Sequence, residues 1–363
     1  MMTIKHPTYR LYLLILVALS LFVTSCSKSE QASNLSHEVE ATFHINLQDG
    51  ATARSIGDGT TAKALLYEIR QAGEVVSKRT IADAFAIDMT YSLTLKVIEG
   101  ADYEYIFWAQ KPDAPYGTED LSAIEMNYED TPANDEGRDA FFAAGTFIGG
   151  EAVGEVVLKR PFAQFNVGAE ERFYENVELG GMYMDYSTVE LKKVPTVFHP
   201  LTGEASAPQD IRFVVTETPA NQTGDSLVVT IDEVNYTYRY LSMNYLLAHT
   251  EKTLFDAWTG MYGTPNVLVM GNQVLNVPLQ RNYRTNLLYF YKGGGGDPDD
   301  PDPDDPDNPV DPDVPVDPDK PDDPDEPGKP DRPSGGGTIV DMVDGTFIIV
   351  VDPNFTSDHN KKK

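Results

Sequence analysis

The only cysteine of the chain, Cys26, follows Val23, Thr24 and Ser25. An apolar residue, two small residues and a cysteine form the pattern of a bacterial lipobox, in which small residues admit the signal peptidase and the thiol accepts a diacylglycerol. The alternative is a plain signal peptide with an incidental cysteine. The position of Cys26 favours the lipobox, so we predict lipidation there and cleavage of the chain just before it.

The residues before Cys26 must deliver it to a membrane. Lys5 and Arg10 precede a mostly apolar run from Leu11 to Val23, which fits the core of a signal peptide and is too short for a comfortable transmembrane span. We therefore expect a signal peptide over 1–25 and a polar, lipidated tether over 26–37. Several acyl chains anchor firmly, because each buried methylene contributes about 0.8 kcal/mol.

No other residues form a recognisable catalytic, cofactor or metal site. Gly57-Asp-Gly59-Thr-Thr-Ala62 superficially matches a dinucleotide-binding pattern but lacks the amphipathic helix that must follow it, so a turn is favoured. The histidines after Cys26 are scattered without a His-x-x-x-His pair: His37, His44, His199, His249 and His359. We predict a non-enzymatic protein without cofactor or metal.

Charge excludes further classes of partner. The net charge of -29 argues against nucleic acid and against anionic lipid headgroups. Nearly half of the excess lies in 297–333, where 16 acidic residues face three basic ones. One cysteine permits no disulfide within the chain, so the body must be held by its core.

Apolar and polar residues alternate through most of the body, which predicts strands with one face on a core. Examples are Phe43-Ile45-Leu47, Leu65-Tyr67-Ile69, Leu93-Leu95-Val97 and Ala163-Phe165-Val167. The apolar run from Tyr103 to Ala109 indicates a central strand and favours core packing for Trp108. The alternative for Trp108, and for Trp258, is stacking on sugars. Many short strands with little helix indicate sandwiches.

Two local details complete the predicted elements. Gly271-Asn272 between apolar runs predicts a hairpin of Val267–Met270 with Gln273–Leu279, with Pro278 at a sheet edge or bulge. Short helical turns are expected within Asp135–Ala144 and Ala169–Glu178.

The region 293–337 predicts a disordered Gly/Pro/Asp linker. From Pro298 to Pro333 proline recurs at nearly every third position, which favours polyproline II. Charge repulsion extends the residues 297–333 to roughly 115 Å at about 3.1 Å per residue. Beyond it, Asp344-Gly345 between apolar runs predicts a hairpin within 338–363. That hairpin either docks on its own body or adds as a strand to a neighbouring subunit.

Three segments resemble recurring blocks of fimbrillin-like lipoproteins, the superfamily that supplies type V pilus subunits, and more closely a subfamily of unassigned function within it. They are Asn134-Asp-Glu-Gly-Arg-Asp-Ala-Phe-Phe142, Leu158-Lys-Arg-Pro-Phe-Ala-Gln-Phe-Asn-Val-Gly168 and Val277-Pro-Leu-Gln-Arg-Asn-Tyr-Arg-Thr-Asn286. The resemblance implies an all-β chain of two tandem transthyretin-like β-sandwich domains, for which we expect 38–157 and 158–292. It also implies lipid-mediated transport to the surface of the outer membrane.

The resemblance further implies that an Arg-directed protease removes the lipidated segment and first strand, and that a strand from another subunit fills the gap. Here the first strand would span about Glu40 to Gln48, and Arg54 is the processing candidate. The long linker departs from simple stalk subunits, so an anchor, tip or accessory subunit of a fimbrium is expected. The alternative is a lipid-anchored glycan-binding protein associated with nutrient uptake at the outer membrane, with a host or other glycan ligand.

Overall fold

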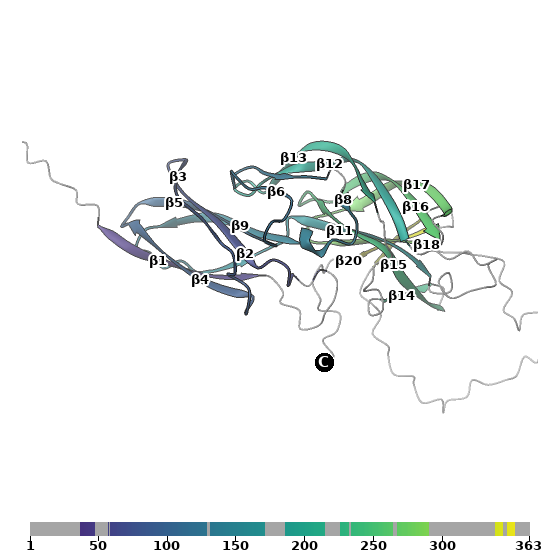
Figure 1. Cartoon of the computed structure of the whole chain (residues 1–363), viewed down its shortest axis with the longest axis horizontal. Coiled ribbons are helices and arrows are strands. Elements are labelled where there is room, and N and C mark those ends of the chain that lie inside the picture. The colour runs from purple at the N-terminus through teal and green to yellow at the C-terminus, as the bar shows by residue number, and fades with distance from the viewer. Residues whose placement is uncertain are drawn as a thin grey trace, which may run out of the picture.

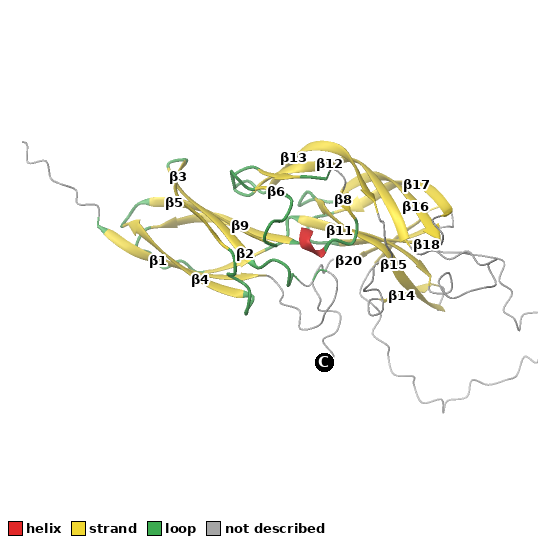
Figure 2. Ribbon diagram, in the orientation of Figure 1, coloured by secondary structure: helices red, strands yellow, loops and turns green. Residues whose placement is uncertain are grey.

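The computed structural model shows an elongated all-β molecule in which two β-sandwiches lie side by side (Figure 1). The structure describes residues 37–47, 57, 59–128, 131–170, 186–214, 226–231, 234–263, 267–289, 338–343 and 347–352. Almost all of these residues lie in strands and connecting loops, and one short 3-10 helix, η1 (Glu136–Arg138), lies near the middle of the molecule (Figure 2). The prediction of an all-β fold is confirmed.

The first sandwich packs a sheet of three strands on a sheet of four. The first sheet has the order β10-β1-β4, with β10 (Glu155–Leu158), β1 (Glu38–Leu47) and β4 (Thr90–Ile98). The second has the order β3-β2-β5-β9, with β3 (Glu74–Ile81), β2 (Ala64–Gln71), β5 (Asp102–Gln110) and β9 (Ala140–Ile148). As predicted, Phe43, Ile45 and Leu47 are buried between the sheets.

The second sandwich packs sheets of seven and six strands. The seven-stranded sheet has the order β17-β16-β12-β13-β8, with β7 beside β12 and β6 beside β7. These strands are β17 (Val267–Leu279), β16 (Thr253–Gly263), β12 (Tyr186–His199), β13 (Glu204–Val214), β8 (Thr131–Pro132), β7 (Ile124–Met126) and β6 (Tyr116–Gly117).

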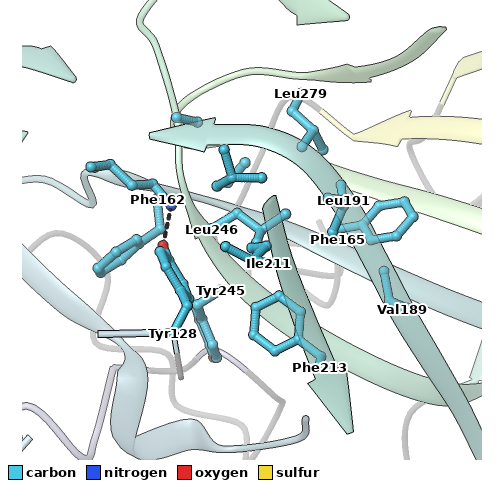
Figure 3. Close-up of a cluster of buried hydrophobic side chains, with 14 of the residues drawn as sticks. Tyr128, Phe162, Phe165, Val189, Leu191, Ile211, Phe213, Tyr245, Leu246 and Leu279 are labelled. Carbon is cyan, nitrogen blue, oxygen red and sulfur yellow. Dashed lines mark hydrogen bonds between the residues drawn. The ribbon is translucent and has the colours of Figure 1, made fainter. Parts of the chain in front are cut away.

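The six-stranded sheet has the order β14-β15-β11-β18-β20-β19. Its strands are β14 (Ser226–Ile231), β15 (Val234–Leu247), β11 (Phe162–Glu170), β18 (Arg284–Tyr289), β20 (Phe347–Asp352) and β19 (Thr338–Val343). The core between the two large sheets includes Phe165 of β11 and Val189 and Leu191 of β12 (Figure 3). The dashed line in Figure 3 is the bond that the Leu247 N–H donates to the Tyr128 hydroxyl, at 2.8 Å.

Strand β2 and the second half of β5 in the first sandwich are buried on both faces, which the alternating pattern of β2 did not predict. Leu65, Tyr67 and Ile69 face the first core as expected. Leu66 and Trp108 face the core of the second sandwich. Because the second sandwich covers this outer face, the two halves of the body share a continuous apolar interface, and the core packing predicted for Trp108 is confirmed.

The predicted hairpin over 267–279 is wrong, because β17 runs straight through it. Gly271 and Asn272 pair with Gly260 and Thr259 of β16 inside one continuous antiparallel ladder. The Trp258 indole lies beside Gly271, with an ideal Gly271 Cβ lying 3.1 Å from its Cζ2, although Gly271 itself remains exposed. Pro278 does lie on an edge strand, as predicted, because β17 ends its sheet.

The first of the two predicted helical segments, Asp135–Ala144, is mostly extended. Only Glu136–Arg138 forms a helical turn, which begins where the Asp135 side chain accepts a hydrogen bond from the Gly137 N–H, and β9 follows at once. β11 continues through Ala169 to Glu170, and the rest of that second segment lies outside the described residues. The apolar side chains of Phe141 and Ala169 are taken up by sheet packing, which overrides weak helical propensity.

The C-terminal hairpin docks on its own chain. β19 and β20 pair antiparallel, as Asp344-Gly345 predicted, and β20 pairs antiparallel with β18 from Arg284↔Asp352 to Tyr289↔Phe347. Both faces of β20 are buried: Phe347 and Ile349 join the core between the large sheets, and Ile348 and Val350 join a smaller cluster with Leu288. Of the two placements left open by the sequence, the structure shows the intramolecular one.

Candidate functional site

The first strand occupies the middle of a small sheet and is therefore the only link between its neighbours. β1 pairs antiparallel with β4 from Glu38↔Ile98 to Asn46↔Thr90 and parallel with β10 from His44↔Glu155 to Leu47↔Leu158. The observed bounds, Glu38–Leu47, lie close to the predicted Glu40 to Gln48. Removing β1 would leave facing strand edges on β4 and β10, which is the geometry that accepts an added strand.

The inward face of β1 is apolar and tightly packed. Phe43 is fully buried, and its ring centroid lies 5.1 Å from those of Phe107 and Phe147 and 5.5 Å from that of Tyr105. Edge-on packing of this kind adds about 0.5–1.5 kcal/mol per pair beyond area burial. The slot that β1 fills is therefore lined by aromatic rings and takes one large apolar side chain at its centre.

The outward face of β1 is polar. It contacts the neighbouring strands β4 and β10 through exposed side chains. The Thr42 and Thr94 hydroxyls lie 3.0 Å apart, and the His44 Nδ1 lies 3.2 Å from the Ser92 hydroxyl. Asn46 donates to Glu155. Exposed pairs of this kind contribute little, so the buried face and the backbone ladder hold the strand. Any strand with large apolar residues at alternate positions can fill the buried face and form the backbone ladder.

The chain beyond β1 is fixed to the body at Gly57. The Gly57 N–H donates to Glu136 Oε2 at 3.0 Å, and its carbonyl accepts from the Arg160 guanidinium. Four residues later, the Thr61 hydroxyl donates to the Glu136 carbonyl at 2.8 Å. Gly57 and Gly59 adopt φ of 81° and 74°, so the predicted turn is present. Arg54 and Cys26 themselves lie outside the described residues.

A buried ion pair lies beneath this attachment. Arg160 donates from Nε and from a terminal nitrogen to the two carboxylate oxygens of Asp139, each at 2.8 Å, and both side chains are at most 2% exposed. The guanidinium also lies 4.5 Å from the centroid of the Phe141 ring. Arg160 belongs to the connection between β10 and β11, so the pair fixes the point where the chain passes from the first sandwich to the second.

The three segments that carry the fimbrillin resemblance meet at this junction. Phe142 and Lys159 exchange backbone hydrogen bonds of 2.8 and 2.9 Å, and the Asn282 N–H donates to the Phe162 carbonyl at 2.8 Å. The Arg281 guanidinium lies 5.8 Å from the centroid of the Phe142 ring. The shared blocks therefore encode the joint between the sandwiches, and sequence reasoning did not foresee this role.

Burial at the junction shifts two titratable groups. Burial lowers the pKa of the Arg281 guanidinium to about 10, which leaves it charged at neutral pH. It donates to the Ala248 carbonyl at 3.0 Å and to the Gly203 carbonyl at 2.7 Å. Burial also raises the pKa of Tyr245 well above its usual range, and nearby Glu136 and Asp139 raise it further. Both groups keep one charge state across the physiological range, so they serve as fixed structural contacts.

The two tryptophans differ in position. Trp108 is fully buried, packs near Tyr116, Phe162 and Phe198, and donates to Gln110 Oε1 at 2.7 Å. Trp258 lies outside the apolar cores and is half-buried on β16. Of the two, only Trp258 has a ring surface that a ligand can reach.

Within the described ranges, no group of three His, Cys, Asp or Glu side chains is arranged to hold a metal ion. No helix in that same part of the chain is both long and apolar enough to span a bilayer.

Comparison with known proteins gives one family and several solved structures. A family model described as a family of unknown function, DUF6562, matches residues 31–288. No curated protein matches the chain. The chain is 10% identical, with a TM-score of 0.45, to an adhesin candidate from Bacteroides thetaiotaomicron, covering 71% of this chain and 93% of that chain.

Two further structures are fimbrial proteins. The fimbrial anchor protein Mfa2 from Porphyromonas gingivalis is 9% identical, with a TM-score of 0.39, covering 69% of this chain and 91% of that chain. A fimbrial assembly protein from Parabacteroides distasonis is 11% identical, with a TM-score of 0.39, covering 70% of this chain and 93% of that chain. At these values the likeness carries no argument about function.

Proposed function

We propose that this chain, which belongs to the family of unknown function DUF6562, is a non-enzymatic surface lipoprotein that serves as an anchor, tip or accessory subunit of a fimbrium. The proposal has lipid on Cys26 deliver it to the outer membrane, where a cut at Arg54 then removes the lipidated segment together with β1. Its partners are other subunits that add a strand where β1 now lies. The fimbrillin-like blocks of the sequence support this reading, because they build the joint between two sandwiches.

The observation that carries the proposal is the attachment of the chain on either side of Arg54. Before it, β1 is held by a ladder and by one apolar face. After it, Gly57 is fixed to Glu136 and Arg160 of the body. A cut between these two attachments would separate the lipid and β1 from the body while leaving the remaining fold tied at Gly57. An aromatic slot would then be open to a donor strand.

The lipid anchor is tested by replacing the modified cysteine. We expect Cys26→Ala to leave unprocessed precursor and to abolish retention in the membrane, because no thiol remains to accept the acyl chains. Detergent phase separation and mass spectrometry of the N-terminus measure both effects. Ser27→Ala, one residue further on, is the control and should behave as wild type. Partitioning of Cys26→Ala into the detergent phase would contradict the prediction.

Processing is tested at Arg54. We expect native surface material to begin at Ser55, and Arg54→Ala material to begin at Cys26, keep its lipid and fail to enter filaments labelled by antibody to residues 38–292. Lys63→Ala, an exposed basic residue near the same turn, is the matched control for an Arg-directed protease and should be processed normally. Native material that begins at Cys26 would show instead that the lipid is a permanent anchor.

A further inference from the structure

Trp258 occupies the outer face of the seven-stranded sheet. Its neighbours in the chain, Ala257 and Thr259, are buried, and alternation along β16 therefore turns Trp258 away from the core. It stands in register with Glu190 of β12 on one side and Gln273 of β17 on the other. The half-buried indole thus lies in the middle of a three-strand surface.

Two glycines allow the indole to lie flat on the sheet. A Cβ added to Gly260 would lie 2.6 Å from the indole Cη2, and one added to Gly271 would lie 3.1 Å from its Cζ2. The first distance is too short for a side chain and the second leaves room for one only if the indole shifts, so the six-membered ring lies against the backbone of two adjacent strands. Because one ring face is against the backbone, the exposed part of Trp258 is the opposite face.

Polar side chains form a row beside this ring. Glu190 is half-buried and Gln273 is exposed, and the Arg212 Nε of β13 lies 3.5 Å from the Glu190 carboxylate. Neighbouring strands are about 4.8 Å apart, so Arg212 and Glu190 lie on one side of Trp258 and Gln273 lies on the other. The Glu190–Arg212 pair is neutral in sum, which favours an uncharged polar ligand over a free cation or anion.

One hydroxyl on the same face has no partner. Thr188 precedes core residue Val189 and pairs in register with Gly260, so alternation places it beside the Trp258 ring. It is 5% exposed, and in the part of the chain that the structure describes its Oγ1 makes no hydrogen bond. A buried hydroxyl without a partner is costly, but this oxygen is screened from solvent, so it adds to the cost of the fold and contributes nothing to a ligand site.

We propose that Trp258, Glu190, Gln273 and Arg212 form a binding site for a hexopyranose unit of a glycan. The face of such a ring that carries C–H bonds would pack on the indole, where dispersion and the ring quadrupole favour it. Its edge hydroxyls would donate to Glu190 and Gln273 and accept from Arg212. The site goes beyond the proposed fimbrial role, since a subunit can assemble without any glycan ligand.

The test is binding of full-length protein to immobilised glucose, galactose, mannose and N-acetylglucosamine oligosaccharides, followed by titration with the best-bound one. We expect Trp258→Ala to weaken binding at least ten-fold and Trp258→Phe to weaken it less. Leu254→Ala, at a 55% exposed apolar residue of the same strand, is the matched control and should bind as wild type. Trp108 is fully buried, so a change in tryptophan emission reports Trp258.

Two results would overturn the site. One is wild-type protein that binds none of the oligosaccharides at millimolar concentration, in which case Trp258 serves only to cover strand glycines. The other is unchanged binding by a folded Trp258→Ala variant. If that variant does not fold, acrylamide quenching of wild-type emission decides: protection by the oligosaccharide supports the site, and unchanged quenching refutes it.

Discussion

Deleting residues 338–363 is expected to unfold the second sandwich. β20 lies beside β18 inside the sheet and buries side chains on both faces: Phe347, Ile348, Ile349 and Val350 are each at most 2% exposed. Burying a side chain of this size is worth about 1.5–3 kcal/mol. The four together contribute roughly 6–12 kcal/mol, which is comparable with the whole stability of a typical domain, about 5–15 kcal/mol.

Thermal unfolding followed by circular dichroism, with light scattering for association, measures the effect. We expect loss of the cooperative transition or soluble aggregates, because the deletion exposes the edge of β18 and the apolar cluster around Leu288. Deleting only 353–363, which follow β20, is the matched control and should leave the melting temperature unchanged. A truncated protein that melts like the full chain would show that the hairpin is not part of the fold.

The hairpin of β19 and β20 should stay bound to the body after the chain that connects them is cut. Protease cleavage within 293–337 is expected to leave the hairpin bound, since the ladder and buried faces remain intact. As the linker that its composition predicts, 293–337 would mainly raise the local concentration of the hairpin. Co-elution of the cut hairpin with the body in gel filtration would agree with this, and its loss would mean that tethering alone maintains docking.

Local sequence predicted the elements that depend on local chemistry. Alternation placed Phe43, Ile45 and Leu47 on one core, and Asp344-Gly345 placed the final hairpin, because period and turn geometry are properties of a few adjacent residues. The sheet edge on which the hairpin docks could not be predicted. Its apolar faces fit any open sheet edge, and only the complete fold shows that β18 supplies one.

The features that the sequence did not predict all depend on contacts between residues far apart in the chain. Glu68 alternates with Leu65, Tyr67 and Ile69, so it lies on the face of β2 that points away from the first core. It is 1% exposed and accepts from Lys78 at 2.8 Å, from Arg70 and from the Leu121 N–H at 3.1 Å. Gly271 and Asn272 match a two-residue turn, because nothing in their own strand indicates that Gly260 and Thr259 of β16 pair with them. Propensity and period carry no information about such partners.

The junction between the sandwiches should depend strongly on Asp139. Asp139→Ala removes both hydrogen bonds to the Arg160 guanidinium and leaves that charge buried, at 2% exposure, without its carboxylate. Breaking a buried pair in this way costs about 3–5 kcal/mol. For a protein of this size, we expect the melting temperature to fall by on the order of 10 °C.

Two matched variants distinguish the cost of leaving a charge buried from the cost of losing an ion pair. Asp139→Ala/Arg160→Met removes both charges and should recover most of the stability, because an apolar side chain fills the space without a desolvation cost. Asp210→Ala breaks the exposed pair between Asp210 (59% exposed) and Lys192 (56% exposed), and it should lower the melting temperature far less than Asp139→Ala.

The consequence for function follows from what Arg160 also holds. The same guanidinium donates to the Gly57 carbonyl, so a variant that displaces it also loosens the chain between β1 and the body. We therefore expect Asp139→Ala to increase amide hydrogen exchange in β1 and at Gly57 more than in β14, which is remote from the junction. Uniform exchange across β1 and β14 would show that the pair stabilises the body without controlling release of the first strand.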